Sequence, residues 1–172
     1  MATNLEFIDS TEVTSSTSAF SFDNIFSANY DVYEIYLTGF STVGSTQTSQ
    51  YIRLIDSGGS VVSTTTYDYA FLRMPANTSF SEGKSTTANF FVTGQMDLTP
   101  EVQNTKMIVY NPYSSSSYTF VQGQTATRFA GNGNGYKFIG VEHTAQTIRG
   151  IQVLEPNVRP FDEGKISVYG VK

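Results

Sequence analysis

Apolar side chains recur at every second residue through much of this chain, and that period limits the fold more than any other feature. In YDVYEIYLTGF (30–40), Tyr33, Ile35 and Leu37 alternate with polar or aromatic neighbours. An extended strand points successive side chains to opposite faces, so the pattern predicts strands with one face in a core. The ranges interpreted in this way are 5–8, 18–22, 30–40, 50–56, 61–66, 89–93, 106–110, 118–122, 136–142, 148–154 and 164–172.

The alternation also predicts which side chains form the core. Large apolar residues that share the inward phase of a strand are expected to be mostly buried. The predicted core consists of Leu5, Phe7, Tyr33, Ile35, Leu37, Ile52, Leu54, Ile108, Ile139, Val141, Ile166 and Val168.

Turn signals separate the predicted strands. DSGG (56–59) lies between two of them and predicts a tight hairpin in which Gly58 and Gly59 take positive φ. AGNGNG (130–135) is interpreted as a longer loop. No amphipathic segment of helix length is present. Many short strands with regular turns predict an all-β chain: an antiparallel β-sandwich, jelly-roll-like, forming a single domain over 1–172.

Composition excludes several classes of partner. Charged residues make up 15% of the 172 residues and the net charge is −5, where soluble domains carry about 25% charged residues. The basic residues are scattered, so we expect neither nucleic acid nor membrane insertion. The chain has no cysteine, which excludes disulfides and thiolate metal sites. The start, MATNLEFIDSTEV, shows no pattern of a signal peptide, so we expect the product to stay in the cytoplasm or to leave inside a larger particle.

Catalytic groups are sparse. His143 is the only histidine, and neither a serine elbow nor a matching acid indicates a triad around it. A glycosidase needs two carboxylates across a sugar bond, and acids near turns offer them, although solvated turn residues are the favoured interpretation. We therefore expect no enzyme, no catalytic residue, no cofactor and no metal site. The acids weighed are Asp56, Asp68, Glu82, Asp97, Glu101 and Glu142.

An aromatic stripe is the strongest candidate contact. In TYDYAFLRM (66–74), Tyr67, Tyr69 and Phe71 share one face of an extended strand. Exposed, they would stack on sugar rings; the favoured alternative is a core or a subunit interface. The candidate interface or glycan contact consists of Tyr67, Tyr69, Phe71 and Met74, with loops 79–84 and 111–117 nearby.

Four segments in a fixed order carry a family resemblance: YDVYEIYLTGF (30–40), IRLIDSGGSVVSTTTYDYA (52–70), IVYNPYSSSSYTFV (108–121) and ISVYGVK (166–172). Together they resemble small all-β virion proteins of tailed bacteriophages, especially phages of marine bacteria and cyanobacteria. The resemblance covers about 29–172 and its motifs are structural. It implies a virion location after assembly in the host cytoplasm, and threefold association.

The leading hypothesis is therefore a non-enzymatic virion structural protein, an appendage or tail-fibre component for host recognition that assembles as a homotrimer. Its expected partners are other virion proteins and a host-surface glycan. The first alternative is a capsid decoration protein that stabilises the phage head. A free carbohydrate-binding module and a glycan depolymerase are further alternatives.

Overall fold

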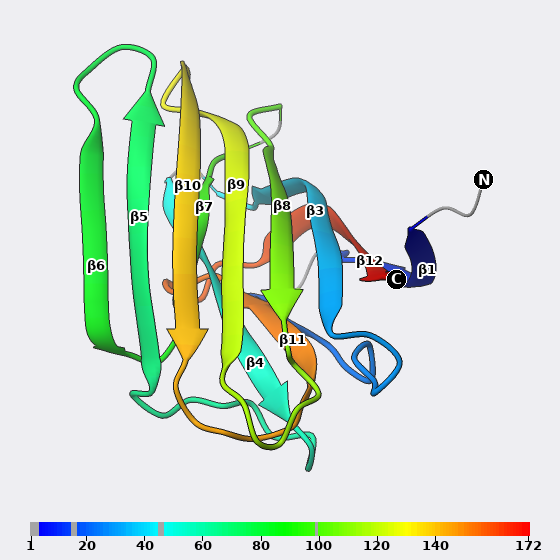
Figure 1. The fold of residues 1–172 in the computed structure, drawn as a ribbon. Helices are drawn as coiled ribbons and strands as arrows, with labels where there is room; N and C mark the ends of the chain where they lie inside the picture. Colours follow the sequence, from blue (N-terminus) through cyan, green and yellow to red (C-terminus); the bar gives the residue numbers. More distant parts are fainter. Residues whose placement is uncertain (1–3, 15–16, 45–46, 99) are drawn as a thin grey trace.

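The computed structural model describes residues 4–14, 17–44, 47–98 and 100–172, and these residues form two sheets packed face to face (Figure 1). All neighbouring strands are antiparallel, and no helix occurs in the described ranges. The large sheet has the spatial order β1 (Leu5–Glu12), β12 (Phe161–Val171), β3 (Val32–Thr42), β8 (Gln103–Tyr110), β9 (Thr119–Phe129), β10 (Asn132–Glu142), β5 (Tyr67–Pro75) and β6 (Ser81–Ala88). The small sheet has the order β2 (Ala19–Phe22), β11 (Ile148–Leu154), β4 (Thr48–Asp56) and β7 (Phe91–Met96).

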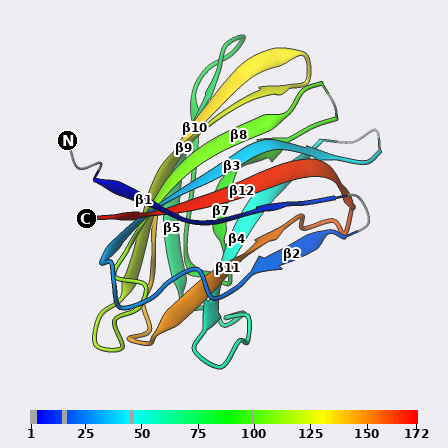
Figure 2. The same ribbon diagram turned by 90° about the vertical axis from the view of Figure 1, so that its right-hand side faces the viewer.

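The all-β antiparallel sandwich predicted from the sequence is confirmed. Figure 2 shows the two layers from the edge, with β2, β11 and β4 beneath β1, β12 and β3. Hairpins join β8, β9 and β10 in succession, whereas most other connections cross from one sheet to the other. Such repeated crossing is the connectivity expected of a jelly-roll-like sandwich.

The core lies between the sheets and follows the two-residue period. Tyr33 and Ile35 are fully buried on β3, because every second residue of that strand faces the small sheet. The hydroxyl of Tyr33 accepts the Ser27 N–H at 2.7 Å and donates to the Ser27 carbonyl at 2.9 Å, so the buried phenol keeps its hydrogen bonds. The predicted core residues confirmed as buried are Tyr33, Ile35, Leu37, Ile52, Leu54, Ile166 and Val168.

One part of the core is polar. Gln103 on β8 donates from Nε2 to Gln50 Oε1 of the small sheet at 2.5 Å and to Thr105 Oγ1 at 2.9 Å. Thr93 also donates to Gln50 Oε1, at 3.1 Å, and Thr125 donates to the Thr93 carbonyl at 2.6 Å. An unpaired buried polar group costs about 1–3 kcal/mol, so this network favours the one alignment of the sheets in which these bonds form.

The turn after β4 differs in part from its prediction. Asp56 Oδ1 accepts the N–H groups of Gly58 and Ser60 at 2.8 and 2.9 Å, which closes the turn. Gly59 has a φ of 84° as predicted, but Gly58 does not have a positive φ. The prediction for Gly58 was wrong. The Asp56 carboxylate accepts the two N–H groups that close the turn, and only Gly59 takes a positive φ. The expected strand at 61–66 is reduced to one bridge, between Ile55 and Val61.

A second correction concerns 130–135. The sequence predicted a loop there, but only Ala130 and Gly131 form the turn, with φ of 54° and 76°. Two positive φ values at a two-residue turn match the right-handed twist of the flanking strands. Strand β10 therefore begins at Asn132, paired with Phe129 of β9. The Ser/Thr-rich strand β6, which follows Met74 and Pro75, was not predicted.

Candidate functional site

Large apolar side chains lie on the outer face of the large sheet, where solvent rather than the small sheet covers them. Ile139 is 60% exposed and Phe7 is 57% exposed, and Leu5 is exposed as well. The prediction that these three are core residues was wrong. In β10 the inward side chains are Tyr136 and Phe138; the period was right, but the phase was misassigned because both faces of this strand carry large residues.

Two open hollows cross this outer face. The first, called here the outer hollow, has a volume of about 670 Å³. A second hollow of about 1090 Å³ adjoins it and shares Ala70, Gln122 and Ile139 with it. The second hollow also borders Tyr110 and Phe120. The side chains that line the outer hollow from the solvent side are Lys106, Ile108, Gln122, Gln124, Lys137, Ile139, Ala70 and Leu72.

Hydrogen bonds fix the geometry at one side of the outer hollow. Lys106 Nζ lies 2.9 Å from Glu34 Oε1 and 5.5 Å from the ring centroid of Tyr36. The Tyr36 hydroxyl donates to Glu34 Oε2 at 2.7 Å. Burial disfavours the ionised form of Glu34, but the bonds from Tyr36 and Lys106 outweigh it and lower the pKa of Glu34. The bond to Glu34 raises the pKa of Lys106, so both groups stay charged at neutral pH.

Lys137 occupies the other side of the same hollow in a different state. Its side chain is exposed on β10, and it forms no ion pair with any residue of the described ranges. Beyond Tyr36 the outer face continues into an aromatic row: the rings of Tyr36 and Tyr169 lie 5.7 Å apart, and those of Tyr169 and Phe7 lie 5.6 Å apart. The outer face therefore offers a free ammonium group, amides and apolar surface together.

The predicted aromatic stripe lies on the opposite, inner face of the sheet. Tyr67 is fully buried; its hydroxyl accepts the Leu54 N–H at 3.0 Å and donates to the Val62 carbonyl at 2.9 Å. Burial raises the pKa of Tyr67. Tyr67 therefore offers no surface to a partner. Met74 is on the outer face, where its Cε would lie 3.3 Å from a Cβ at Gly135, so the four candidate residues are divided between two faces.

Tyr69 and Phe71 remain half-exposed, because β5 and β6 extend beyond the edge of the small sheet (Figure 1). Their rings stack with centroids 6.2 Å apart and planes 8° apart. Phe90 continues the stack at 6.2 Å from Tyr69 and lies 3.9 Å from Tyr51, with planes 6° apart. These four rings form a second candidate contact, called here the overhang aromatics.

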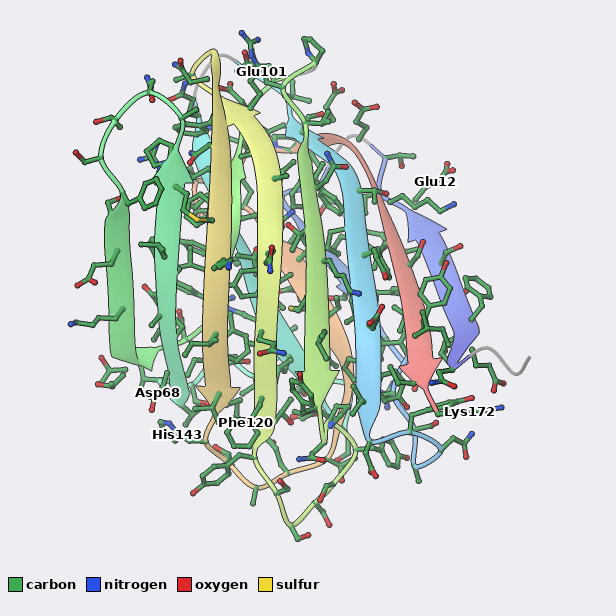
Figure 3. The ribbon with its side chains drawn as sticks, turned by 45° about the horizontal axis from the view of Figure 1, so that its top comes forward. Glu12, Asp68, Glu101, Phe120, His143 and Lys172 are labelled. Atoms are coloured by element: carbon green, nitrogen blue, oxygen red, sulfur yellow. The ribbon has the colours of Figure 1, made fainter. Side chains whose placement is uncertain are left out.

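His143 and Asp68 lie together at one end of the large sheet, near Phe120 (Figure 3). His143 Nδ1 is 3.3 Å from Asp68 Oδ1, and both side chains are more than a third exposed. The hydrogen bonds of the described residues bring no serine or threonine hydroxyl to the His143 ring. Glu142 is buried and accepts the Thr144 N–H and Gln146 Nε2, both at 3.2 Å. No cluster of three or more potential metal ligands occurs in the described ranges.

The other acids considered as a glycosidase pair bind nearby residues of the fold. Glu101 bonds to Arg128 Nη1 at 2.6 Å, and Asp97 accepts the Ala130 N–H at 3.1 Å. Glu82 lies on the edge strand β6, 4.0 Å from Lys84 Nζ. The described ranges contain no helix that is long and apolar enough to span a membrane.

Sequence reasoning missed the outer hollow. Its side chains come from KMI (106–108), QGQ (122–124), KFI (137–139) and AFL (70–72) on four strands, and within each segment the first and third residues face outward. The alternation of outward and inward residues was visible in each segment, but it did not reveal that these four segments are neighbours.

Comparison with known proteins identifies no family. No family model matches the chain, and no curated protein matches it either. A solved structure of the CBM2 module of an evolved Dit from Lactobacillus casei BL23 phage J-1 is 11% identical, covering 90% of this chain and 69% of its own, with a TM-score of 0.25. A fructofuranosidase variant from Schwanniomyces occidentalis, complexed with fructosylnystose, is 7% identical over 99% of this chain and 35% of its own, with a TM-score of 0.28.

A subviral particle of infectious bursal disease virus VP2 is 11% identical over 98% of this chain and 40% of its own, with a TM-score of 0.16. At these TM-scores the three structures carry no argument about this chain.

Proposed function

We propose that this protein is a non-enzymatic structural component of a tailed-phage virion, placed on an appendage or tail fibre, and that it contacts the host surface. The motifs that resemble phage virion proteins motivate the particle. The outer face of the large sheet motivates the contact, since the described chain exposes apolar side chains beside lysines and amides there. Exposed apolar surface rimmed by polar groups is typical of interaction sites.

The observation that carries this proposal is the pair of adjoining hollows on the outer face. An outward sheet face ordinarily carries polar side chains, yet Ile139, Leu72 and Phe120 are exposed here. Solvation of these groups is unfavourable by about 25 cal/mol per Å² of apolar surface. We explain the exposure of these apolar side chains by a partner that covers them for part of the life cycle.

The location in the particle tests this proposal. Antibodies against the purified protein, coupled to gold, should label tail appendages of intact virions in electron micrographs. Labelling spread evenly over the head would instead identify the capsid decoration alternative. Absence of the protein from purified virions by mass spectrometry would contradict the proposal altogether.

The overhang aromatics support an interface between copies of this chain, and the resemblance to phage virion proteins favours a homotrimer as the assembled form. Aromatic side chains are enriched in the centres of interfaces, and Tyr69, Phe71 and Phe90 are only half-buried in a single chain. Sedimentation equilibrium should give a trimer mass for the wild type. Tyr69→Ala should weaken the trimer, whereas Tyr118→Ala, at an exposed ring away from the overhang, should not. A wild-type monomer at high concentration would contradict the free trimer.

The non-enzymatic assignment has its own test at His143. His143→Ala should leave infectivity and adsorption of the assembled phage unchanged, because the His143 side chain pairs only with Asp68 among the interactions of the described residues, and the backbone N–H that donates to the Thr66 carbonyl at 2.9 Å is retained. A hydrolytic rate on host polysaccharide that disappears with this substitution would show an enzyme.

A further inference from the structure

Four neighbouring strands arrange the outer hollow as two parallel rows of side chains. Cross-strand pairing places one residue from each of β8, β9, β10 and β5 in each row. The first row is Lys106, Gln124, Lys137 and Leu72, and the second is Ile108, Gln122, Ile139 and Ala70. The first row is cationic and polar, and the second is mostly apolar.

The charge of the first row is unbalanced inside the hollow. Lys106 and Lys137 line it, and no aspartate or glutamate does. Glu34 neutralises Lys106 from the far side, while Lys137 has no ion-pair partner in the described ranges. The two lysines are two strands apart, which separates them by about 10 Å. A ligand with negative groups repeated along its length matches this arrangement.

The second row indicates what kind of polyanion fits. Ile139 and Ile108 offer aliphatic surface, and the phenylalanines beside them, Phe71 and Phe138, point to the inner face. Single-stranded nucleic acid is held by stacking of bases on exposed aromatic rings, which this hollow lacks. A sugar ring presents C–H groups to aliphatic side chains, and its hydroxyls suit the amides of Gln122 and Gln124.

We propose that the outer hollow binds an acidic polysaccharide whose chain runs across the strands. Its carboxylates contact Lys137 and Lys106, and its ring faces pack on Ile139 and Leu72. This inference rests on the proposed function in host contact and names the class of glycan. Tyr36 and Glu34 are positioning residues, since they hold Lys106 in place.

Binding to one polymer in two chemical forms tests the inference. Polygalacturonate and its fully methyl-esterified form have the same backbone and differ only in the carboxylate charge. The full-length protein should bind immobilised polygalacturonate, measured by biolayer interferometry, and should bind the ester about tenfold more weakly. A parallel arm with alginate and hyaluronan extends the carboxylate series, and single-stranded DNA is the control for simple ion exchange.

Matched variants assign the binding to the hollow. Lys137→Gln should weaken binding about fivefold, the scale of one exposed charge pair, and Lys137→Arg should restore it. Ile139→Ala should weaken binding without changing the unfolding midpoint. Lys165→Gln removes the same charge from an exposed position of β12 that lies outside the hollow, and it should leave affinity within twofold of the wild type.

The outcomes separate this inference from the proposed function. Equal binding of acid and ester overturns the acidic class but leaves glycan contact standing. Binding of DNA as tight as that of the acid forms, with equal losses from Lys137→Gln and Lys165→Gln, overturns it as ion exchange. No binding to any acid polymer also overturns it, and gold labelling of tail appendages still decides the proposed function independently.

Discussion

The two faces of the large sheet carry similar apolar side chains in opposite environments. On the inner face Ile35 is fully buried, and on the outer face Ile139 is 60% exposed. Burial of the first stabilises the fold, whereas exposure of the second leaves surface for a partner. A strand sequence therefore shows which residues share a face, but the use of each face depends on whether another sheet lies over it. Substitutions on the two faces should differ accordingly.

The largest effect is expected from truncation on the inner face. Ile35→Ala should lower the free energy of unfolding by about 2–5 kcal/mol, because it removes a buried side chain and leaves a cavity. Urea unfolding followed by circular dichroism measures this loss. A loss below about 1 kcal/mol would show that the inner face is not the core that its burial indicates.

Two glycines of β10 give the next comparison. A Cβ on Gly140 would lie 2.5 Å from Phe91 Cδ1 and 2.9 Å from the Asp68 carbonyl oxygen, so Gly140→Ala should cost about 1–3 kcal/mol through overpacking. A Cβ on the outward Gly133 would meet only Ala76 Cβ, at 3.7 Å. Gly133→Ala should therefore be neutral or stabilise by up to about 1 kcal/mol. Thermal unfolding of both variants tests the contrast, and equal midpoints would contradict it.

The polar part of the core should respond more weakly. Gln103→Leu removes two hydrogen bonds, but Gln50 Oε1 keeps its bond from Thr93 and Thr105 keeps its bond to Thr125. The expected loss is about 1 kcal/mol, the net contribution of a typical hydrogen bond. Gln122→Leu, on the outer face, should change the denaturant midpoint little. A larger loss for Gln122 than for Gln103 would reverse the ranking of the faces.

Acid titration measures a smaller contribution to the free energy of unfolding, that of the Glu34–Lys106 ion pair on the outer face. The pKa of Glu34 is lowered, because hydrogen bonds from Tyr36 and Lys106 outweigh the opposing effect of burial. A folded-state pKa below the unfolded value of about 4.3 gives stability that is present above pH 4.3 and is lost as the pH falls through the folded value. Glu34→Gln should therefore flatten the acid side of the stability curve, by less than about 1 kcal/mol. An unchanged dependence between pH 5 and 2 would refute the role of this pair.

The smallest effect is expected from Ile139→Ala. With more than half of the side chain already in solvent, its loss should change the free energy of unfolding by less than about 0.5 kcal/mol. Equilibrium unfolding at low protein concentration measures this for the single chain. A loss of about 2 kcal/mol that grows with protein concentration would mean that a second copy covers the outer face.

Much of the sheet structure was predictable from local pattern. The period of two in the segments of β3, β4 and β12 placed their buried residues correctly, since charged residues such as Glu34, Arg53 and Lys165 mark the opposite face of each strand. The glycine turn after β4 was also visible, with Gly59 at positive φ. Of the hollow residues, only Ile108 and Ile139 had been singled out, and as core residues.

What the sequence by itself determined is the class of fold: strands, turns and one core, because period and turn chemistry are local properties of the chain. The tertiary structure alone decided the phase of β10, which face of β5 the small sheet covers, and the juxtaposition of Lys106, Gln124 and Lys137. The physical reason is that a face becomes core only where another sheet lies over it, and cross-strand neighbours are set by pairing between segments distant in sequence. The candidate binding surface depends on both.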